Sequence, residues 1–177
     1  MSDINKLWYR VSKAAVGAVF NVHGTTLEVI LGVPPIQTMG RVISIKHYLK
    51  VIHDSDDIHF DFVKSQLEEK NPTVLCHLRH VQKFLLWKAE HFSSEVQGCD
   101  LSDIAQRNLE HILLLPQKTY KYTKGMIQQF TELLWRESIL NLLMTEGWSE
   151  IPRVSCNPLP IPHGVSRKVE VLVKILQ

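Results

Sequence analysis

The chain has 177 residues, of which 45% are hydrophobic and 21% are charged. This length and composition are those of about one ordinary globular domain, and no low-complexity tract or internal repeat is evident. The formal net charge of +2 is too small to indicate a nucleic-acid-binding or membrane-binding protein by itself, so any electrostatic function must depend on how the charges are distributed.

The charges are distributed unevenly along the chain. Residues 1–52 contain six Lys or Arg and two acids, whereas residues 53–71 contain six acids and two lysines. Two further segments, residues 116–125 and 151–177, are also basic. The basic residues therefore lie in separated islands, and these islands are the candidates for contacts with an anionic partner.

Cysteine usage and hydropathy both favour an intracellular protein. The three cysteines, Cys76, Cys99 and Cys156, are odd in number and have no Cys-x-x-Cys spacing, which argues against a disulfide framework and against a cysteine zinc knuckle. The apolar run at residues 14–20 is too short for a signal peptide or a bilayer span. We expect a cytoplasmic or nuclear protein with no membrane partner.

Helical periodicity begins near the N-terminus. Apolar residues recur at three- or four-residue steps over about residues 3–22, and this spacing predicts an amphipathic helix. Gly17 lies inside the segment and costs roughly 1 kcal/mol relative to alanine.

The next segment, Gly24–Ile36, predicts a short helix, a turn and the start of a second helix set at an angle to the first. Thr25 and Glu28 have the spacing of a capping box, so a helix should begin at this point. Gly32 can take the left-handed conformation that ends a helix, and the two prolines that follow oppose its continuation while presetting the first turn of the next helix.

The helical pattern then continues through most of the chain. It runs to His53, where the run Asp54–Asp57 breaks it and offers helix caps. Further helices are predicted around residues 60–67, over 74–87 after the break at Asn71-Pro72, over 102–114, and from Thr123 to a stop at Gly147. The polar residues 91–100 are predicted to form a surface loop.

The C-terminal part has a different character. Residues 151–164 contain four prolines and predict an extended connector. Residues 165–177 predict a final amphipathic helix, although three alternate valines leave a strand open, and its lack of a stop signal suggests a truncated fragment. We therefore expect an all-α multi-helix bundle in which residues 1–150 form one helical domain, followed by the connector and the C-terminal helix.

No sequence motif indicates a catalytic site, a metal site or a cofactor site. Cys76 and His80 have the i, i+4 spacing of two metal ligands, but no second ligand pair is evident, so a buried small thiol beside surface histidines is the preferred interpretation. The run Asp54–Asp57 invites comparison with the magnesium-binding aspartates of polymerases, but helical patterns flank it instead of apolar strands. Helix capping by solvated acids accounts for it.

One segment has the composition of a nucleic-acid-binding surface. Lysines attract phosphates and tyrosine rings stack on unpaired bases, and both occur at a predicted helix start in Lys118, Tyr120, Lys121, Tyr122 and Lys124. The alternative is a solvated loop whose tyrosines fold onto the core. The pair Arg167 and Lys168, at the start of the last predicted helix, is open to the same two interpretations.

Residues 12–48 resemble the region that follows the palm in reverse transcriptases of non-LTR retrotransposons. The resemblance rests on a helix rich in small residues at 12–20, a hydroxyl-bearing cap at Thr25-Thr26, the apolar helix, glycine and proline pair of residues 27–36, and a second helix from Arg41 to Tyr48. More loosely, the rest of the chain is similar to the helical connection region of such elements.

The resemblance implies polymerase ancestry without polymerase activity, because the catalytic palm and the cysteine- and histidine-containing zinc segment of the family are absent from this sequence. In the family, a thumb-like region grips template and primer through basic helices. On that analogy the candidate contacts are Lys13, Lys46, Lys50, Lys118, Lys121 and Lys124.

Two functions are therefore expected. The first is a non-catalytic nucleic-acid-binding fragment that grips RNA or an RNA-DNA template-primer. The alternative is a stand-alone helical module for protein–protein interaction or self-association, with apolar surface supplied by Leu133, Leu134, Trp135, Leu142, Leu143 and Trp148.

Overall fold

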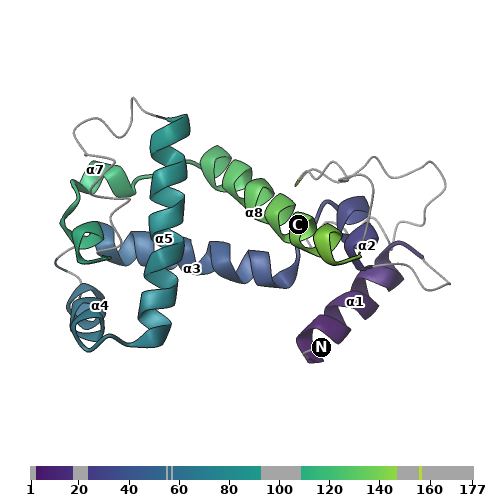
Figure 1. Cartoon of the computed structure of the whole chain (residues 1–177), viewed down its shortest axis with the longest axis horizontal. Coiled ribbons are helices and arrows are strands. Elements are labelled where there is room, and N and C mark those ends of the chain that lie inside the picture. The colour runs from purple at the N-terminus through teal and green to yellow at the C-terminus, as the bar shows by residue number, and fades with distance from the viewer. Residues whose placement is uncertain are drawn as a thin grey trace. The chain divides into compact units, whose positions relative to one another are not determined.

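The structure is a computed structural model that describes residues 3–17, 24–54, 56, 58–92, 109–146 and 156. Within these residues every regular element is a helix, which confirms the predicted all-α fold (Figure 1). The elements are α1 (Asp3–Ala15), α2 (Gly24–Leu31), α3 (Ile36–His53), α4 (Ile58–Glu68), α5 (Pro72–His91), the 3-10 helix η2 (Leu109–Leu114), α7 (Gln117–Tyr120) and α8 (Lys124–Glu146). The predicted connector and C-terminal helix lie outside the described residues, apart from Cys156.

The chain divides into two compact units. Unit 1 is drawn from residues 1–39 and 131–177, and unit 2 is residues 40–130. Helices α3 and α8 each contribute residues to both units. The sequence predicts residues 1–150 as one helical domain. That prediction rests on helical periodicity, which does not indicate which helices share a core.

Helix α1 ends earlier than the periodicity predicts. Its last residue is Ala15, and Gly17 has a φ of 66°, a left-handed conformation that glycine adopts without the steric cost of a Cβ. The Gly17 N–H donates to the carbonyl of Ala14 at 3.2 Å and so closes the helix. The expectation of one continuous helix over residues 3–22 is therefore wrong, because Gly17 ends the helix where it was expected to be tolerated inside it.

The turn between α2 and α3 is a Schellman motif, as its glycine and proline pattern predicts. Gly32 has a φ of 64°, and its N–H donates to the carbonyl of Val29 at 3.2 Å. The N–H of Val33 donates to the carbonyl of Glu28 at 3.0 Å, which completes the motif. After the proline pair, α3 begins at Ile36.

The junction between α4 and α5 uses the same motif without a glycine. Lys70 has a φ of 56°, and the N–H of Asn71 donates to the carbonyl of Gln66 at 2.9 Å. The side chain of Asn71 then caps α5 by accepting from the N–H groups of Thr73 at 3.0 Å and Val74 at 3.5 Å. Asn71 thus ends one helix and starts the next, as the Asn-Pro pair predicts.

Two small clusters form the core of unit 1. Helices α1 and α2 contact each other, and buried Ala15, Leu31 and Val33 pack with partly buried Trp8, Val16 and Met39. In the second cluster Trp135 and Ile139 of α8, which are 0% and 1% exposed, pack against Val29 of α2. The segment that resembles the retroelement family therefore supplies packing residues to both clusters.

Helix α5 is at the centre of unit 2. It contacts α4 and η2, and it passes across α3 (Figure 1). On one side it supplies Phe84 and Trp87 to an aromatic cluster with Phe130, in which the ring centroids lie 5.2 Å apart for both Phe84–Phe130 and Trp87–Phe130. Aromatic pairs at this separation add to the stabilisation from burial.

A buried lysine connects α5 to α7. Lys88 is 0% exposed, and its Nζ donates to the carbonyls of Thr119 at 3.1 Å and Lys121 at 2.6 Å. These carbonyls lie at the C-terminal end of α7, where helix carbonyls need external donors and where the helix dipole favours a cation. The hydroxyl of Tyr120 donates to the carbonyl of Ile112 at 2.5 Å and ties α7 to η2.

Replacing Lys88 with methionine should destabilise the protein. Methionine has a similar length, but it leaves the two carbonyls without their donor, which costs about 2–4 kcal/mol of unfolding free energy in total. Urea unfolding of Lys88→Met against wild type measures the loss, and the exposed Lys64→Met serves as the control, with a change within about 0.5 kcal/mol. A Lys88→Met variant as stable as wild type would show that these bonds do not hold α7 in place.

Glu28 lies inside α2 at a half-buried position. The helix begins at Gly24, one residue before the expected cap at Thr25, so Thr25 and Glu28 both lie within its first two turns. Burial raises the pKa of Glu28 from 4.5 to about 7. The folded protein therefore holds a proton between these pH values that the unfolded chain releases.

This proton makes stability depend on pH. Because the folded-state pKa is the higher one, the contribution of Glu28 is fully present below pH 4.5 and is lost as the pH rises through about 7. The Glu28 contribution should fall by up to about 2 kcal/mol between about pH 5.5 and 8. Urea unfolding at both pH values should show this loss in wild type and a smaller one in Glu28→Gln; equal losses in the two proteins would contradict it.

Candidate nucleic-acid interface

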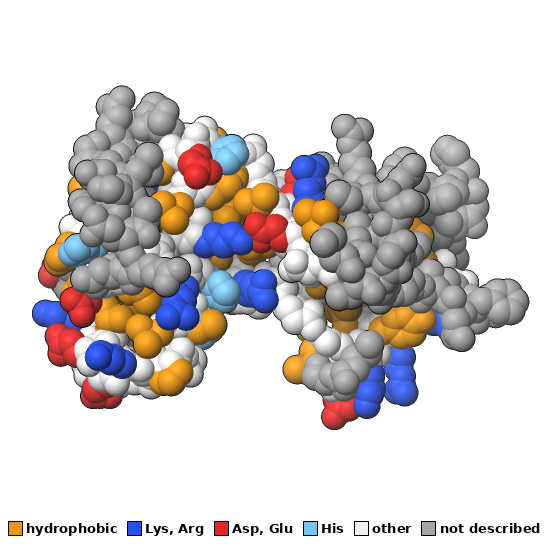
Figure 2. All heavy atoms as spheres, in the orientation of Figure 1, with side chains coloured by type: hydrophobic (Ala, Val, Ile, Leu, Met, Phe, Trp, Pro, Cys, Tyr) orange, Lys and Arg blue, Asp and Glu red, His pale blue; other side chains and the backbone are white. Residues whose placement is uncertain are grey.

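Helices α3 and α5 carry six of the twelve Lys and Arg residues of unit 2 and almost no acids. Helix α3 contains no Asp or Glu, and α5 contains Glu90 alone. Their exposed cations are Arg41, Lys46, Lys50, Arg79 and Lys83. Figure 2 shows Lys, Arg and His side chains, interspersed with hydrophobic and acidic ones, over the region where α5 passes α3. The acids of the sequence island at residues 53–71 belong instead to α4 and the turns beside it.

The two helices are joined through His77. Ser44 Oγ of α3 and His77 Nδ1 of α5 are 2.8 Å apart, within hydrogen-bonding distance. The ring of Tyr48, one turn further along α3, lies over the His77 ring with a centroid separation of 5.2 Å and an interplanar angle of 31°. These contacts fix the position of α5 relative to the adjacent turns of α3.

One turn beyond His77, His80 lies among positive groups. Burial lowers the pKa of the half-buried His80 imidazole below 6.5, and the charges of Arg41, His77 and Lys83 lower it further. All three charged neighbours that act on His80 are cationic or titrate to a cation. We refer to Arg41, His77, His80 and Lys83 as the basic cluster.

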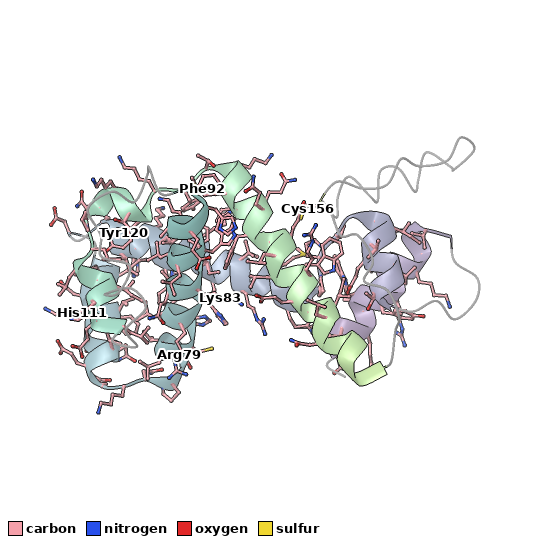
Figure 3. All side chains as sticks on the ribbon, turned by 45° about the horizontal axis from the view of Figure 1, so that its top comes forward. Arg79, Lys83, Phe92, His111, Tyr120 and Cys156 are labelled. Atoms are coloured by element: carbon pink, nitrogen blue, oxygen red, sulfur yellow. The ribbon has the colours of Figure 1, made fainter. Side chains whose placement is uncertain are left out.

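The basic cluster has the electrostatic character of an anion site. The charged form of His80 is destabilised by the other three members, and a bound phosphate would relieve that repulsion. Arg41 adds a planar guanidinium, which can donate two parallel hydrogen bonds to one phosphate. Figure 3 shows Lys83 on α5 with Arg79 one turn away on the same helix, so the cations continue along α5 from the cluster.

The structure also shows the environment of the Cys76 thiol. Cys76 is exposed, not buried as the sequence suggests, and its Sγ lies 3.8 Å from His80 Nε2. Its α5 position faces solvent because the buried stripe of the helix runs through Leu78, Val81 and Leu85. Across the part of the chain that the structure describes, no group of three or more His, Cys, Asp and Glu side chains could hold a metal ion.

The second described cysteine, Cys156, has a thiol of low reactivity. The backbone N–H of Cys156 donates to Glu132 Oε1 at 2.9 Å. Burial, with a further contribution from the Glu132 charge, raises the pKa of the Cys156 thiol to about 11. The thiol is therefore protonated near neutral pH and is a poor nucleophile there.

The predicted lysines do not form one surface. Lys46 and Lys50 are exposed one turn apart on α3, beside the face that buries Ile45 and Leu49. Lys13 is half-buried on α1 of unit 1. Lys118, Lys121 and Lys124 are exposed in and around α7, whereas Arg167 and Lys168 lie outside the described residues.

The predicted tyrosines pack inward. Tyr120 is 2% exposed, so it does not present a ring face on which a base could stack. Tyr122 is half-buried and meets Phe84 edge to face, with the centroids 6.4 Å apart. Of the two interpretations of this segment, the structure agrees with the one in which the tyrosines fold onto the core beside solvated lysines.

Sequence reasoning missed the basic cluster because its members come from two helices. The i, i+4 spacing of Arg79 and Lys83 on α5 is a local signal of a basic face. The proximity of Arg41 to His80 has no local signal, since it depends on how α3 packs against α5.

No helix of the described residues is both long enough and apolar enough to cross a membrane. Comparison with known proteins found no matching protein family, no similar curated protein and no similar solved structure.

The pKa of His80 should report directly on phosphate at the basic cluster. A phosphate bound beside the imidazole favours its charged form, so the pKa of His80, measured by NMR, should rise when a short single-stranded RNA is added. Affinity for the RNA should accordingly increase a few-fold as the pH falls from about 7.5 to 6.

The pH dependence should weaken in His80→Gln and persist in His59→Gln, which removes an exposed histidine on α4. An unchanged or lower His80 pKa in the presence of bound RNA would exclude phosphate from the cluster.

Proposed function

We propose that the chain is a non-catalytic helical module that binds the backbone of RNA or of an RNA-DNA hybrid through the basic cluster of unit 2. We also propose that it derives from the thumb and connection region of a non-LTR retrotransposon reverse transcriptase. The observation that carries the binding proposal is the convergence of Arg41, His77 and Lys83 on the half-buried His80. The ancestry rests on the family-like segment at residues 12–48.

Phosphates are the part of a nucleic acid that this surface suits. The cluster offers cations and imidazoles but no set of amide and carboxylate groups for reading base edges, so it favours contacts that do not depend on sequence. Lys46 and Lys50 lie on the same acid-free helix as Arg41, but helical spacing puts them on its opposite side, so they add positive potential and do not extend the cluster itself. Tyr48, which is half-buried over His77, adds an aromatic ring beside the cations, a combination found in single-strand-binding surfaces.

Binding without catalysis follows from the proposed ancestry. The parent activity would be RNA-directed DNA polymerisation, which uses magnesium bound by aspartates of the palm, and the resemblance begins after the palm. The acids near residue 54 follow α3 and precede α4, in a helical setting unlike that of the polymerase aspartates. The module would therefore hold a template or primer for chemistry performed elsewhere.

A protein-interaction module is the second candidate. The apolar surface for this function was expected on α8. However, Leu134 and Trp135 of α8 are 4% and 0% exposed and belong to the core. Leu133 is half-buried, and the side chains of Leu142, Leu143 and Trp148 lie outside the description. On α8 Leu140 is 41% exposed, but the pairs of large apolar side chains with greater exposure lie on α1 and α4, and these favour the second candidate.

Neutralising the basic cluster should weaken binding to RNA. The double variant Arg41→Gln/Lys83→Gln removes two cations while keeping polar side chains of similar length. Its affinity for a fluorescent single-stranded RNA at about 0.1 M monovalent salt should fall at least about tenfold. The slope of log K against log salt concentration should become shallower by roughly 1.4, because each lost phosphate contact contributes about 0.7 for a single strand.

The matched control is Lys64→Gln/Lys70→Gln, which removes the same charge from exposed positions on α4 and the turn after it. It should bind RNA about as well as wild type. The proposal fails if both double variants lose affinity equally, or if wild type shows no salt-sensitive binding to single-stranded RNA or to an RNA-DNA hybrid.

A further inference from the structure

Helix α1 has two different apolar faces. One face is buried in unit 1, where Trp8, Ser12 and Ala15 follow one another at three- and four-residue steps. The other presents Ile4 and Leu7, whose exposed fractions are 61% and 62%. Two large aliphatic side chains one turn apart at this exposure form an apolar strip on the open side of the helix.

The strip on α1 is bordered by positive charge. Lys6 and Arg10 are exposed on the same helix, and the Arg10 position lies next to Leu7 on the helix surface, three residues away. Lys6 makes an exposed salt bridge with Asp3 at 3.2 Å, which leaves the helix with a net positive charge from Lys6, Arg10 and Lys13 against Asp3. We call Ile4, Leu7 and Arg10 the basic strip.

Helix α4 carries an apolar strip with the opposite border. Ile58 and Phe62 are four residues apart on one face and are 77% and 60% exposed, while Val63 and Leu67 on the other face are buried in unit 2. Asp61 and Glu68 are exposed beside the strip. We call Ile58, Asp61 and Phe62 the acidic strip.

In Figure 2 basic and acidic side chains both lie beside hydrophobic ones over each of the two helices, so the difference between the helices is in the balance of charge. The net charge of the described residues in the acid-rich segment is strongly negative, with Asp54, Asp56, Asp61, Glu68 and Glu69 against Lys64 and Lys70.

We infer that the basic strip of one copy of this chain docks on the acidic strip of a second copy. Both strips expose two large apolar side chains at helical spacing, and their borders carry opposite charge, so a contact between unlike strips buries all four side chains with favourable electrostatics. A contact between two like strips brings Arg10 towards Arg10, or Asp61 towards Asp61, and repulsion disfavours it. The second copy is therefore the occupant that the charges on the chain select.

The contact joins different surfaces of the two copies. Such an interface is heterologous and leaves one basic strip and one acidic strip open at the two ends of every dimer, so association can continue into longer chains of molecules. The strips are short, and an interface this small is weak, with a dissociation constant on the order of 10–100 μM. Association should also weaken as salt is added, since the charged borders are exposed.

Two variants and their mixture test the pairing. Leu7→Asp disables the basic strip and Phe62→Asp disables the acidic strip, both at exposed positions where folding is not at risk. Sedimentation velocity of nucleic-acid-free protein is expected to show concentration-dependent association for wild type and a monomer for each variant alone. An equimolar mixture should form a dimer and nothing larger, because each variant keeps the strip that the other lacks.

Ile43→Asp is the matched control, since Ile43 is a similarly exposed apolar residue, at 64%, on α3 and outside both strips. It should associate like wild type. A wild type that stays monomeric throughout the micromolar range, a variant that associates normally alone, or a mixture that stays monomeric would each overturn the inference. RNA affinity is measured separately, so failure here leaves the proposed function standing.

Discussion

The buried ammonium of Lys88 is the interaction on which unit 2 depends. A charge removed from water must be compensated, and here the carbonyls at the end of α7 provide the compensation. The bond fixes α7 against α5, and α7 leads within a few residues into α8, whose Phe130 completes the aromatic cluster with Phe84 and Trp87. With that side of α5 held in the core, His80 and Lys83 lie on its remaining surface.

Local sequence signals predict the helix boundaries well where backbone chemistry determines them. Gly32 and the proline pair place the turn between α2 and α3, and Thr123 caps α8 by accepting from the N–H of Met126 at 3.2 Å. Gly17 shows the limit of this reasoning, since a glycine inside an apolar period can equally be tolerated or end the helix. Here Gly17 takes the left-handed conformation and ends the helix, an outcome that periodicity does not report.

The functional surface was less predictable than the fold, for a physical reason. Lys46 and Lys50 can be recognised because they share one helix face, but the role of Arg41 depends on the approach of α3 to α5 at His77. Lys88 shows the opposite case, because this lysine is a core residue and its local sequence does not set it apart from the surface lysines. Composition gives the number of cations, and only packing assigns each one to the surface or to the interior.

The central claim is that nucleic acid binds where α3 meets α5, and NMR mapping tests it most directly. Uniformly ¹⁵N-labelled protein is titrated with short single-stranded RNA at low salt, and backbone shifts are followed residue by residue. The account predicts that the shifts concentrate at Arg41–Tyr48 and His77–Lys83 and disappear as salt is raised. Shifts concentrated on α4, or none at RNA concentrations that saturate binding, would contradict it.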